Sequence, residues 1–311
     1  MSARYRRLTL EDFADLFGAK KSAISARCRR HIASADFRYS RLGPRARQAV
    51  LALVSKKIQS DPVVAGKKRR PAWEKGWSEN LKNFVSAGFD VAQLTPKYFR
   101  PNQPLRLYQD YVLPVSSTFE SNWYKAFSLW LFESYLTGVD TIYEFGCGSG
   151  HNLSTLAALY PKKKIIGLDW ARSSVNIAGS LAKAYGWNIE GRRFDFFAPA
   201  KDFHLKPGSA VLTIGALEQT GQKYGAFLKY LLKERPALVI HVEPVCEWYD
   251  GKNPVDRAAI RFHKHRHYWM GYPGVLKELV GKGKIEILKS KRAFFGSLYL
   301  EGYSQLIWRP K

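Results

Sequence analysis

The spacing of hydrophobic residues changes character about a third of the way along the chain. Before residue 105 the apolar positions recur at helical spacing, which predicts helices over residues 11–17, 23–31 and 44–58. After an aromatic-rich helical segment that begins at residue 119, short apolar runs alternate with helical patterns. Such alternation predicts a parallel sheet with helices on both faces. We therefore expect a mainly helical region over residues 1–105 and an α/β domain over residues 106–311.

The α/β part is expected to contain seven strands and the helices between them. Strands are predicted at residues 141–145, 164–169, 189–197, 210–216, 237–243, 284–292 and 304–309. Helices are predicted at residues 119–136, 151–160, 173–185, 222–233 and 275–280, with a longer insertion over 244–271. Ligands on parallel sheets bind at the carboxyl ends of the strands, so candidate chemistry is expected there.

The stretch YEFGCGSGHNL (143–153) joins the first predicted strand of the domain to the next helix. Gly146, Gly148 and Gly150 alternate in it. Glycine permits positive φ, and a side chain at these positions would keep a ligand away from the backbone. Glu144 directly precedes the glycines, and a carboxylate there suits a cationic ligand better than a pyrophosphate. The helix that follows adds its positive N-terminal end.

Two further acids end the next two predicted strands. Asp169 ends the second strand, where an acid can accept both hydroxyls of a ribose. Asp195 ends the third strand, where its carboxylate or the neighbouring amides can meet an adenine edge, with Phe196 beside the ring. A dinucleotide oxidoreductase is the competing interpretation of a glycine loop followed by an acid. That interpretation requires GxGxxG, whereas the third glycine here falls at GxGxG spacing.

These motifs together resemble the class I S-adenosylmethionine-dependent methyltransferases over roughly residues 119–311. The resemblance rests on EFGCGSG, GLDW, RFDFF, the fourth-strand end IGALEQ and the antiparallel-looking last strand YSQLIWRP. It implies an enzyme with a Rossmann-like, seven-stranded sheet that uses S-adenosyl-L-methionine and releases S-adenosyl-L-homocysteine. It also implies that Glu144 and the glycines hold the methionine part, Asp169 the ribose and Asp195 the adenine, with Trp170 against the adenine. The remaining cofactor candidates lie beside these residues: Tyr143, Cys147, Asn152, Phe196 and Gly215.

Methyl transfer requires an acceptor atom held near the methyl group and, where needed, a group that removes its proton. Such groups are expected after the fourth and fifth strands. Glu218 follows the fourth strand as a catalytic candidate, with Gln219 as a substrate contact. Glu243 ends the fifth strand as a second catalytic candidate, with a structural acid of the loop as the alternative. Glu247 follows as a substrate contact. His241 is expected in the core. The Asn/Asp-Pro-Pro-aromatic motif of enzymes that methylate amino groups of adenine or glutamine is not found after the fourth strand.

The stretch RFHKHRHYW (261–269) carries three histidines at alternate positions. On a helix, His263 and His267 would share one face, with His265 nearly opposite. We take His263 and His267 as candidates for supporting the reaction. Two histidines with nearby carboxylates could also bind zinc or iron, but a basic amphipathic helix over the site is the simpler interpretation, and we expect no metal.

The segment over residues 108–127 precedes the first strand of the domain. In the superfamily that the motifs resemble, this segment often closes over cofactor and substrate. Tyr111, Trp123 and Tyr124 are therefore substrate-binding candidates. The alternative is that Trp123 and Tyr124 only pack the helix on the sheet.

The net charge of +24 is the largest anomaly of the composition. Residues 1–100 hold 22 Lys and Arg against 8 Asp and Glu, a balance of +14. Such a field attracts polyanions, including nucleic acid and phosphorylated substrates, without specifying a sequence or a reaction. In LEDFADLFGAKKSAISARCRR, Ala14, Gly18 and Ile24 have the spacing of a helix-turn-helix motif. The N-terminal region is thus interpreted as a substrate cap, a dimerisation element or a nucleic-acid-binding region.

The expected activity is methyl transfer to O or N of a small polar or anionic metabolite, such as a natural-product or sugar intermediate. An RNA or DNA methyltransferase that uses the basic region is the alternative, and a binding module without activity is a third interpretation. No apolar run is long enough for a membrane helix, and the three cysteines are widely spaced, so we expect a cytoplasmic protein with reduced thiols. A homodimer is left open.

Overall fold

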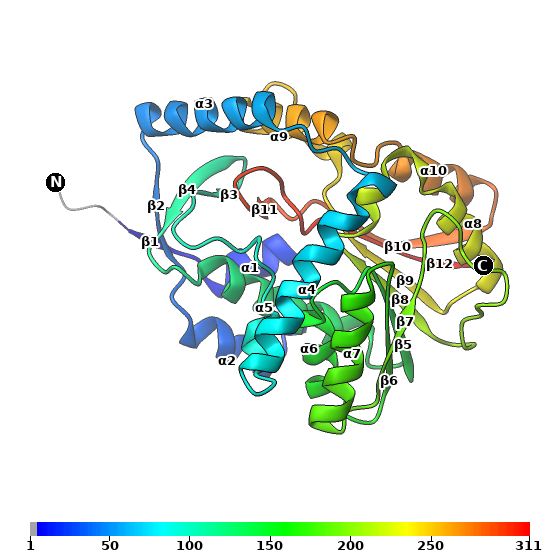
Figure 1. The fold of residues 1–311 in the computed structure, drawn as a ribbon. Coiled ribbons are helices and arrows are strands. Elements are labelled where there is room, and N and C mark those ends of the chain that lie inside the picture. Colours follow the sequence, from blue (N-terminus) through cyan, green and yellow to red (C-terminus); the bar gives the residue numbers. More distant parts are fainter. Residues whose placement is uncertain (1–4) are drawn as a thin grey trace.

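The computed structural model describes residues 5–311, which form two sheets surrounded by helices (Figure 1). The strands are β1 (Arg6–Arg7), β2 (Arg38–Arg41), β3 (Leu105–Leu107), β4 (Asp110–Pro114), β5 (Thr141–Phe145), β6 (Lys164–Asp169), β7 (Ile189–Arg193), β8 (Ala210–Ile214), β9 (Leu238–Val242), β10 (Ile285–Lys291), β11 (Phe295–Gly296) and β12 (Gln305–Pro310). The α-helices are α1 (Leu10–Phe17), α2 (Ala26–Ser34), α3 (Pro44–Ser60), α4 (Arg70–Ser86), α5 (Phe119–Tyr135), α6 (His151–Leu159), α7 (Arg172–Tyr185), α8 (Gly225–Glu234), α9 (Pro254–His265) and α10 (Tyr272–Gly281). Short 3₁₀ turns are η1 (Lys21–Ala23), η2 (Lys67–Arg69), η3 (Val91–Leu94), η4 (Leu217–Lys223) and η5 (Cys246–Trp248).

The larger sheet has seven strands in the order β10-β12-β9-β8-β5-β6-β7. Strands β5 to β9 pair in parallel, whereas β12 runs antiparallel to both β9 and β10. All residues of β5 and β9 are buried, as expected for central strands that helices cover on both faces. This confirms the predicted seven-stranded α/β sheet with its antiparallel last strand.

Several predicted boundaries are shifted in the structure. Strand β7 ends at Arg193 instead of residue 197, and β8 ends at Ile214. Helix α8 begins only at Gly225, because the preceding residues form η4, whose Gly221 has the non-helical φ of 59°. Helix α2 begins at Ala26, where the Ser25 side chain accepts a hydrogen bond from the Cys28 amide.

A second sheet of five short strands, in the order β1-β2-β4-β3-β11, was not predicted. Its strands have two to five residues, too short for a period of two to stand out in the sequence. Strand β2 pairs with β4, and β3 pairs with β11 near the other end of the chain. Strands from both sides of residue 105 therefore share this sheet, and a domain boundary at that residue remains a prediction.

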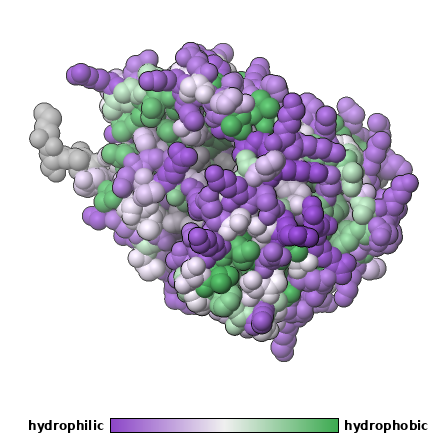
Figure 2. All heavy atoms as spheres, viewed as in Figure 1, coloured by the Kyte–Doolittle hydropathy of each residue, from purple (hydrophilic) through white to green (hydrophobic). Residues whose placement is uncertain are grey.

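The N-terminal helices lie against the α/β core (Figure 1). Helix α4 runs alongside α7, α3 packs on α9, and α2 packs on α5. Hydrophilic residues cover most of the face seen in Figure 2, with small hydrophobic patches between them. Among residues 5–311, no helix combines the length and the apolar character needed to span a membrane.

Candidate functional site

The glycine loop leaves β5 and is fastened to the neighbouring strand by its own amides. The amides of Gly146 and Cys147 donate to the Leu168 carbonyl oxygen at 2.6 and 3.1 Å, and the Gly148 amide donates to Asp169 Oδ2 at 2.9 Å. Gly146, Gly148 and Gly150 all have positive φ, between 50° and 77°, a conformation that glycine adopts without strain. The loop geometry therefore requires glycine before any ligand is considered.

The surroundings of these glycines correct one expectation. A Cβ on Gly148 would lie 2.9 Å from the Trp77 indole, and one on Gly146 would lie 2.4 Å from the Ala216 Cβ. A side chain at these positions would thus meet protein first, not an incoming ligand. The alternating glycines predicted that a ligand lies close to the loop backbone. Part of that place is taken by helix α4, which lies over the loop.

Glu144 lies at the end of β5, beneath the loop, with 1 % of its surface exposed. Its Oε1 accepts a hydrogen bond of 2.6 Å from Asn152, whose Oδ1 accepts one of 2.6 Å from the Tyr124 hydroxyl. Oε2 has no hydrogen-bond partner within residues 5–311. Burial raises the pKa of Glu144 to about 8. Glu144, Asn152 and Tyr124 line one cavity, which we call the glycine-loop cavity, of about 60 Å³.

Asp169 ends β6 on the other side of the loop. Its two carboxylate oxygens accept hydrogen bonds of 2.9 Å from the amides of Gly148 and Ala171. Burial raises its pKa to about 6, even though these amides lower it. Asp169 lines a second cavity of about 50 Å³, here called the Asp169 cavity, together with Trp170, Phe196 and Gly215.

Two other cofactor candidates lie apart from these cavities or are already paired. Asp195 lies between β7 and the following turn and forms an ion pair with Arg70, whose guanidinium lies 5.1 Å from the centre of the Trp170 ring. Tyr143 is buried in the sheet, and its hydroxyl accepts from the Lys206 amide at 3.1 Å. Tyr143 therefore supports the strand from inside, whereas Cys147 reaches the glycine-loop cavity.

Helix α4 forms a roof over both cavities, a feature that sequence reasoning missed. Trp73 and Trp77 stack with their ring centres 5.4 Å apart, and both line the two cavities. Glu74 accepts hydrogen bonds from the Arg172 and Ser173 amides and from the Ser173 hydroxyl, at 2.7, 3.0 and 2.6 Å. It thereby caps α7 from a helix almost a hundred residues away. The four-residue spacing of the two tryptophans in the sequence is typical of a shared helical face, but it does not reveal what that face covers.

The turn after β8 places Glu218 and Gln219 at the rim of the site. Glu218 is buried, and its Oε1 accepts a hydrogen bond of 2.8 Å from the side-chain Nε2 of Gln219. Its Oε2 has no hydrogen-bond partner within residues 5–311. Burial, and then the neighbouring carboxylate of Glu243, raise the pKa of Glu218 well above its usual range.

Glu243 has the contacts of a structural acid, which was the alternative to a catalytic role. It is completely buried, and its two oxygens accept hydrogen bonds of 3.0–3.2 Å from the amides of Ala216 and Leu217. The carboxylate thus holds the turn that carries Glu218. His241 is buried as expected and lies between the Thr213 and Tyr272 hydroxyls, each at 2.9 Å.

A larger cavity of about 240 Å³ adjoins both smaller ones on the side of Glu218. Six of the lining residues are aromatic, and two are carboxylic acids. We call it the tyrosine cavity; it is lined by Trp73, Tyr98, Glu120, Ile214, Gly215, Glu218, Gln219, Pro244, Phe262, Tyr268, Ser297, Tyr299, Leu300, Gly302 and Tyr303. Burial raises the pKa of Glu120 to about 7, although hydrogen bonds from Gln103 and Tyr303 lower it.

The histidine stretch is arranged differently from the prediction. Helix α9 ends at His265, and His267 follows it with φ of 54°, so His263 and His267 do not share a helical face. His263 is fully buried, with Nε2 2.6 Å from the Trp269 carbonyl oxygen, and burial lowers its pKa. His267 is exposed beside a surface groove. Within residues 5–311 no three His, Cys, Asp or Glu side chains are grouped to hold a metal ion.

Three predicted substrate contacts also lie away from the cavities. Tyr111 is buried, and its hydroxyl donates to the Leu298 carbonyl oxygen at 3.1 Å. Trp123 stacks on Phe295 at 4.0 Å inside the core. Glu247 is exposed and accepts from the Gly271 amide. These side chains support the fold, whereas Tyr124 and Gln219 do reach the cavities.

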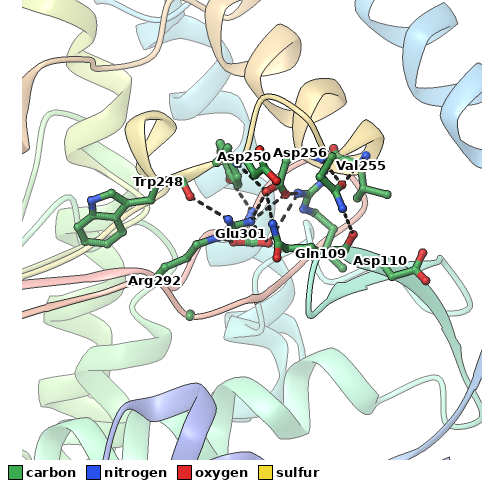
Figure 3. Close-up of polar contacts among 12 residues, drawn as sticks. Gln109, Asp110, Trp248, Asp250, Val255, Asp256, Arg292 and Glu301 are labelled. Carbon is green, nitrogen blue, oxygen red and sulfur yellow. Dashed lines mark hydrogen bonds and ion pairs between the residues drawn. The ribbon is translucent and has the colours of Figure 1, made fainter.

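A buried ionic network positions the wall of the tyrosine cavity (Figure 3). Asp256 on α9 accepts hydrogen bonds from Arg106 at 2.7 Å and from Arg292 at 2.7 and 2.8 Å. Arg292 also donates to both oxygens of Glu301, at 2.6 and 2.9 Å. The network therefore ties the segment 297–303 to α9 and to the second sheet. Removing one partner would leave a buried charge without its counterion, which is strongly destabilising.

Comparison with protein-family models gives no match for this sequence, and comparison with curated proteins gives none either. Among solved structures, the [4+2]-cyclase SpnF is 12 % identical, with 80 % of this chain and 97 % of SpnF covered at a TM-score of 0.52. The 16S rRNA methyltransferase RmtF is 12 % identical, with 97 % of both chains covered at 0.45. The methyltransferase domain of a bacterial Hen1 is 20 % identical, with 58 % of this chain and 92 % of that one covered at 0.41.

The likeness to SpnF and the strand order agree on one architecture. The chain has a Rossmann-like fold with a mostly parallel seven-stranded sheet, which is the fold that the sequence motifs led us to expect. A fold of this kind supports many reactions, so the reaction must be argued from the site.

Proposed function

We propose that the protein is a methyltransferase that uses S-adenosyl-L-methionine and acts on O or N of a small molecule. The observation that carries the proposal is the placement of Glu144 and Asp169 at the ends of β5 and β6, where each lines a small cavity that shares residues with the tyrosine cavity, with Asp195 two residues beyond β7. Glu144 Oε2 is buried and without a partner within residues 5–311, which fits a site that awaits a cationic group.

When bound, S-adenosyl-L-methionine would supply an electrophilic methyl group on a positively charged sulfur. Glu144 would hold the ammonium group of the methionine part, and Asp169 would accept the ribose hydroxyls. Asp195, with Trp170 and Phe196, would contact the adenine once Arg70 has left it. We assign these roles from the order of the neighbouring strands β5, β6 and β7 that carry or precede the three acids, and each role is a proposal.

The acceptor would occupy the tyrosine cavity, with Glu218 as the group that takes up the proton lost by the acceptor. Burial and the neighbouring Glu243 raise the pKa of Glu218, so its ionised carboxylate is a stronger proton acceptor than that of an ordinary glutamate. Glu120 and Glu218 line this cavity, and no lysine or arginine of residues 5–311 does, so its lining favours a neutral polar or cationic reacting group over an anionic one. Gln219 and Tyr268 are proposed contacts of that group.

Cofactor binding requires helix α4 to move. The glycine-loop and Asp169 cavities measure about 60 and 50 Å³, whereas cavities that bury a ligand of drug size have a few hundred. Trp73 and Trp77 lie between them. We therefore propose that α4 opens to admit the cofactor and closes over it.

The test is transfer of a labelled methyl group from S-adenosyl-L-methionine to a panel of phenols, amines and hydroxy acids, followed by mass spectrometry of the product. Glu218→Gln is the variant that we expect to be inactive. Glu278→Gln, which changes an exposed residue of helix α10, is the matched control. Transfer by the wild type and the control but not by Glu218→Gln supports the proposal. Equal transfer by all three would remove Glu218 from the mechanism.

A nucleic-acid methyltransferase is the second candidate. The net charge of +24 and a groove lined by lysines beside the site favour it. Its signature is binding to RNA or DNA that weakens steeply as salt rises. Cytoplasmic location and the oligomeric state remain predictions.

A further inference from the structure

A basic groove of about 710 Å³ runs beside the mouth of the site. Its walls come from three separate parts of the chain: η2 and the residues before it, η4, and the end of α9. The basic side chains that line it are those of Lys67, Lys68, Lys223, Lys264 and His267. All five are exposed, and no carboxylate of residues 5–311 lines the groove.

The charge of the groove is not cancelled by nearby acids. None of its four lysines forms an ion pair with a carboxylate of the described chain. The acid in the neighbouring loop, Asp61, is buried and pairs with Arg266, which is also next to the groove. Like charges held together on opposite walls repel one another and favour a multivalent anion between them.

The groove is continuous with the site. Phe197 and Thr220 line both the groove and the Asp169 cavity, and Tyr268 lines both the groove and the tyrosine cavity. Lys67 lies 5.3 Å from the centre of the Phe197 ring. A molecule with its reacting end in the tyrosine cavity can therefore extend past Tyr268 into the groove.

We propose that the groove binds a phosphate ester that belongs to the acceptor. This inference rests on the proposed methyl transfer and narrows its substrate class. The tyrosine cavity offers aromatic rings and carboxylic acids, whereas the charged side chains of residues 5–311 that line the groove are lysines, so the acceptor has two unlike ends. The reacting end is neutral or cationic and flat enough for aromatic walls, and the far end carries phosphate.

Phosphate fits the groove better than a single carboxylate does. Four ammonium groups and an imidazole surround one space, and each ammonium is a compact charge with three donors. A phosphate ester brings up to two charges and three acceptor oxygens, which can satisfy several lysines at once. The phosphate could come from a small phosphorylated metabolite or from a single-stranded RNA, and the test separates the two.

The test uses the full chain, saturated with S-adenosyl-L-homocysteine, and two ligands: inorganic pyrophosphate and a labelled single-stranded RNA of about twelve nucleotides. Binding is measured for the wild type, for Lys67→Glu with Lys264→Glu, and for a matched control, Lys162→Glu with Lys282→Glu. The control lysines are equally exposed but lie beside the start of β6 and β10, at the opposite edge of the sheet.

We expect the groove variant to bind its ligand at least about tenfold more weakly, with a salt slope smaller by roughly two for RNA, while the control keeps wild-type affinity. Pyrophosphate that binds as tightly as RNA indicates a small phosphorylated acceptor; RNA that binds far more tightly indicates a nucleic-acid acceptor. Equal affinities for both variants, or no binding of either ligand by the wild type, would overturn the proposal.

Heats of S-adenosyl-L-homocysteine binding, recorded for the same three proteins, distinguish a failure of the phosphate-binding proposal from a failure of the proposed methyl transfer. Their presence in all three shows that the variants are folded and that the cofactor site works, so a missing phosphate effect then counts against the groove alone. No heat with the wild type would count against the proposed function instead.

Discussion

The carboxylate of Glu74 is one of the contacts that hold helix α4 over the site, so its removal tests whether α4 must open to admit the cofactor. In Glu74→Ala, the amides of Arg172 and Ser173 and the Ser173 hydroxyl lose their acceptor. Loss of an N-terminal cap costs about 0.5–2 kcal/mol, and a hydrogen bond to a charged group contributes roughly 1.5–3 kcal/mol when well shielded. Because Glu74 is partly exposed and water replaces some of these bonds, we expect a loss of about 2 kcal/mol.

That loss should lower the melting temperature by about 4 °C, since a chain of this size shifts by roughly 2 °C per kcal/mol. The matched control is Glu79→Ala on the same helix. Glu79 pairs with Lys97 at the surface, where ion pairs contribute little, and its removal should leave the melting temperature unchanged. Both are measured by scanning calorimetry.

The pH dependence adds a second check. Burial raises the pKa of Glu74, but the hydrogen bonds from Ser173 and Arg172 lower it by more, so the net pKa lies below its usual range. A carboxylate of this kind stabilises the fold fully above its unfolded pKa of about 4.3 and loses that effect as pH falls through the folded value. The difference between Glu74→Ala and wild type should therefore be the same at pH 7 and pH 5.

Stopped-flow binding of S-adenosyl-L-homocysteine reports on the roof itself. If α4 must open, loosening its fastening should raise the association rate in Glu74→Ala and leave it unchanged in Glu79→Ala. A variant as stable as wild type, with the same association rate, would refute both the capping role of Glu74 and the opening of α4.

Three further predictions concern the acids of the site. With a pKa of about 8, Glu144 is mostly protonated at pH 7, so binding of a cationic ammonium should release close to one proton and tighten as pH rises through about 8. Calorimetry in buffers of different ionisation enthalpy should show the proton release, and Glu144→Gln should abolish that release. Glu218→Gln should lower kcat by about 10²–10⁴ while S-adenosyl-L-homocysteine affinity stays the same, and unchanged kcat would exclude it as the base. Glu243→Ala should lower the free energy of unfolding by roughly 2–4 kcal/mol, because the buried amides of Ala216 and Leu217 lose their acceptor, and a variant as stable as wild type in urea titration would contradict that role.

The parts of the site that sequence predicted are those attached to strand ends. Glu144 and Asp169 lie at the ends of two neighbouring parallel strands, and Asp195 lies two residues beyond the end of a third. Such ends meet at one edge of the sheet whatever the rest of the fold does. The local motif was enough to place them. It could not reveal that Asp195 is paired with Arg70, since the two are more than a hundred residues apart.

Glu243 shows why the sequence could not assign a role to every candidate residue of the site. Alternation along a strand separates a buried face from an exposed one only if one face meets solvent, and β9 is buried on both faces. Sequence could therefore place Glu243 at a strand end but not tell a site carboxylate from one that holds a turn. The sequence also did not predict that Trp73 and Trp77 cover the cavities, because the residues that they meet there come from distant segments of the chain.

The most direct test of the account is calorimetric titration of S-adenosyl-L-homocysteine into wild type and Asp169→Asn. The asparagine keeps the shape of the side chain and one acceptor for the Gly148 amide, but it lacks the charge that would bind the ribose hydroxyls. We predict one binding site per chain in the wild type and affinity at least about thirtyfold lower in the variant, equivalent to about 2 kcal/mol. Equal affinity in both proteins, or binding of a nicotinamide dinucleotide in place of S-adenosyl-L-homocysteine, would contradict the account.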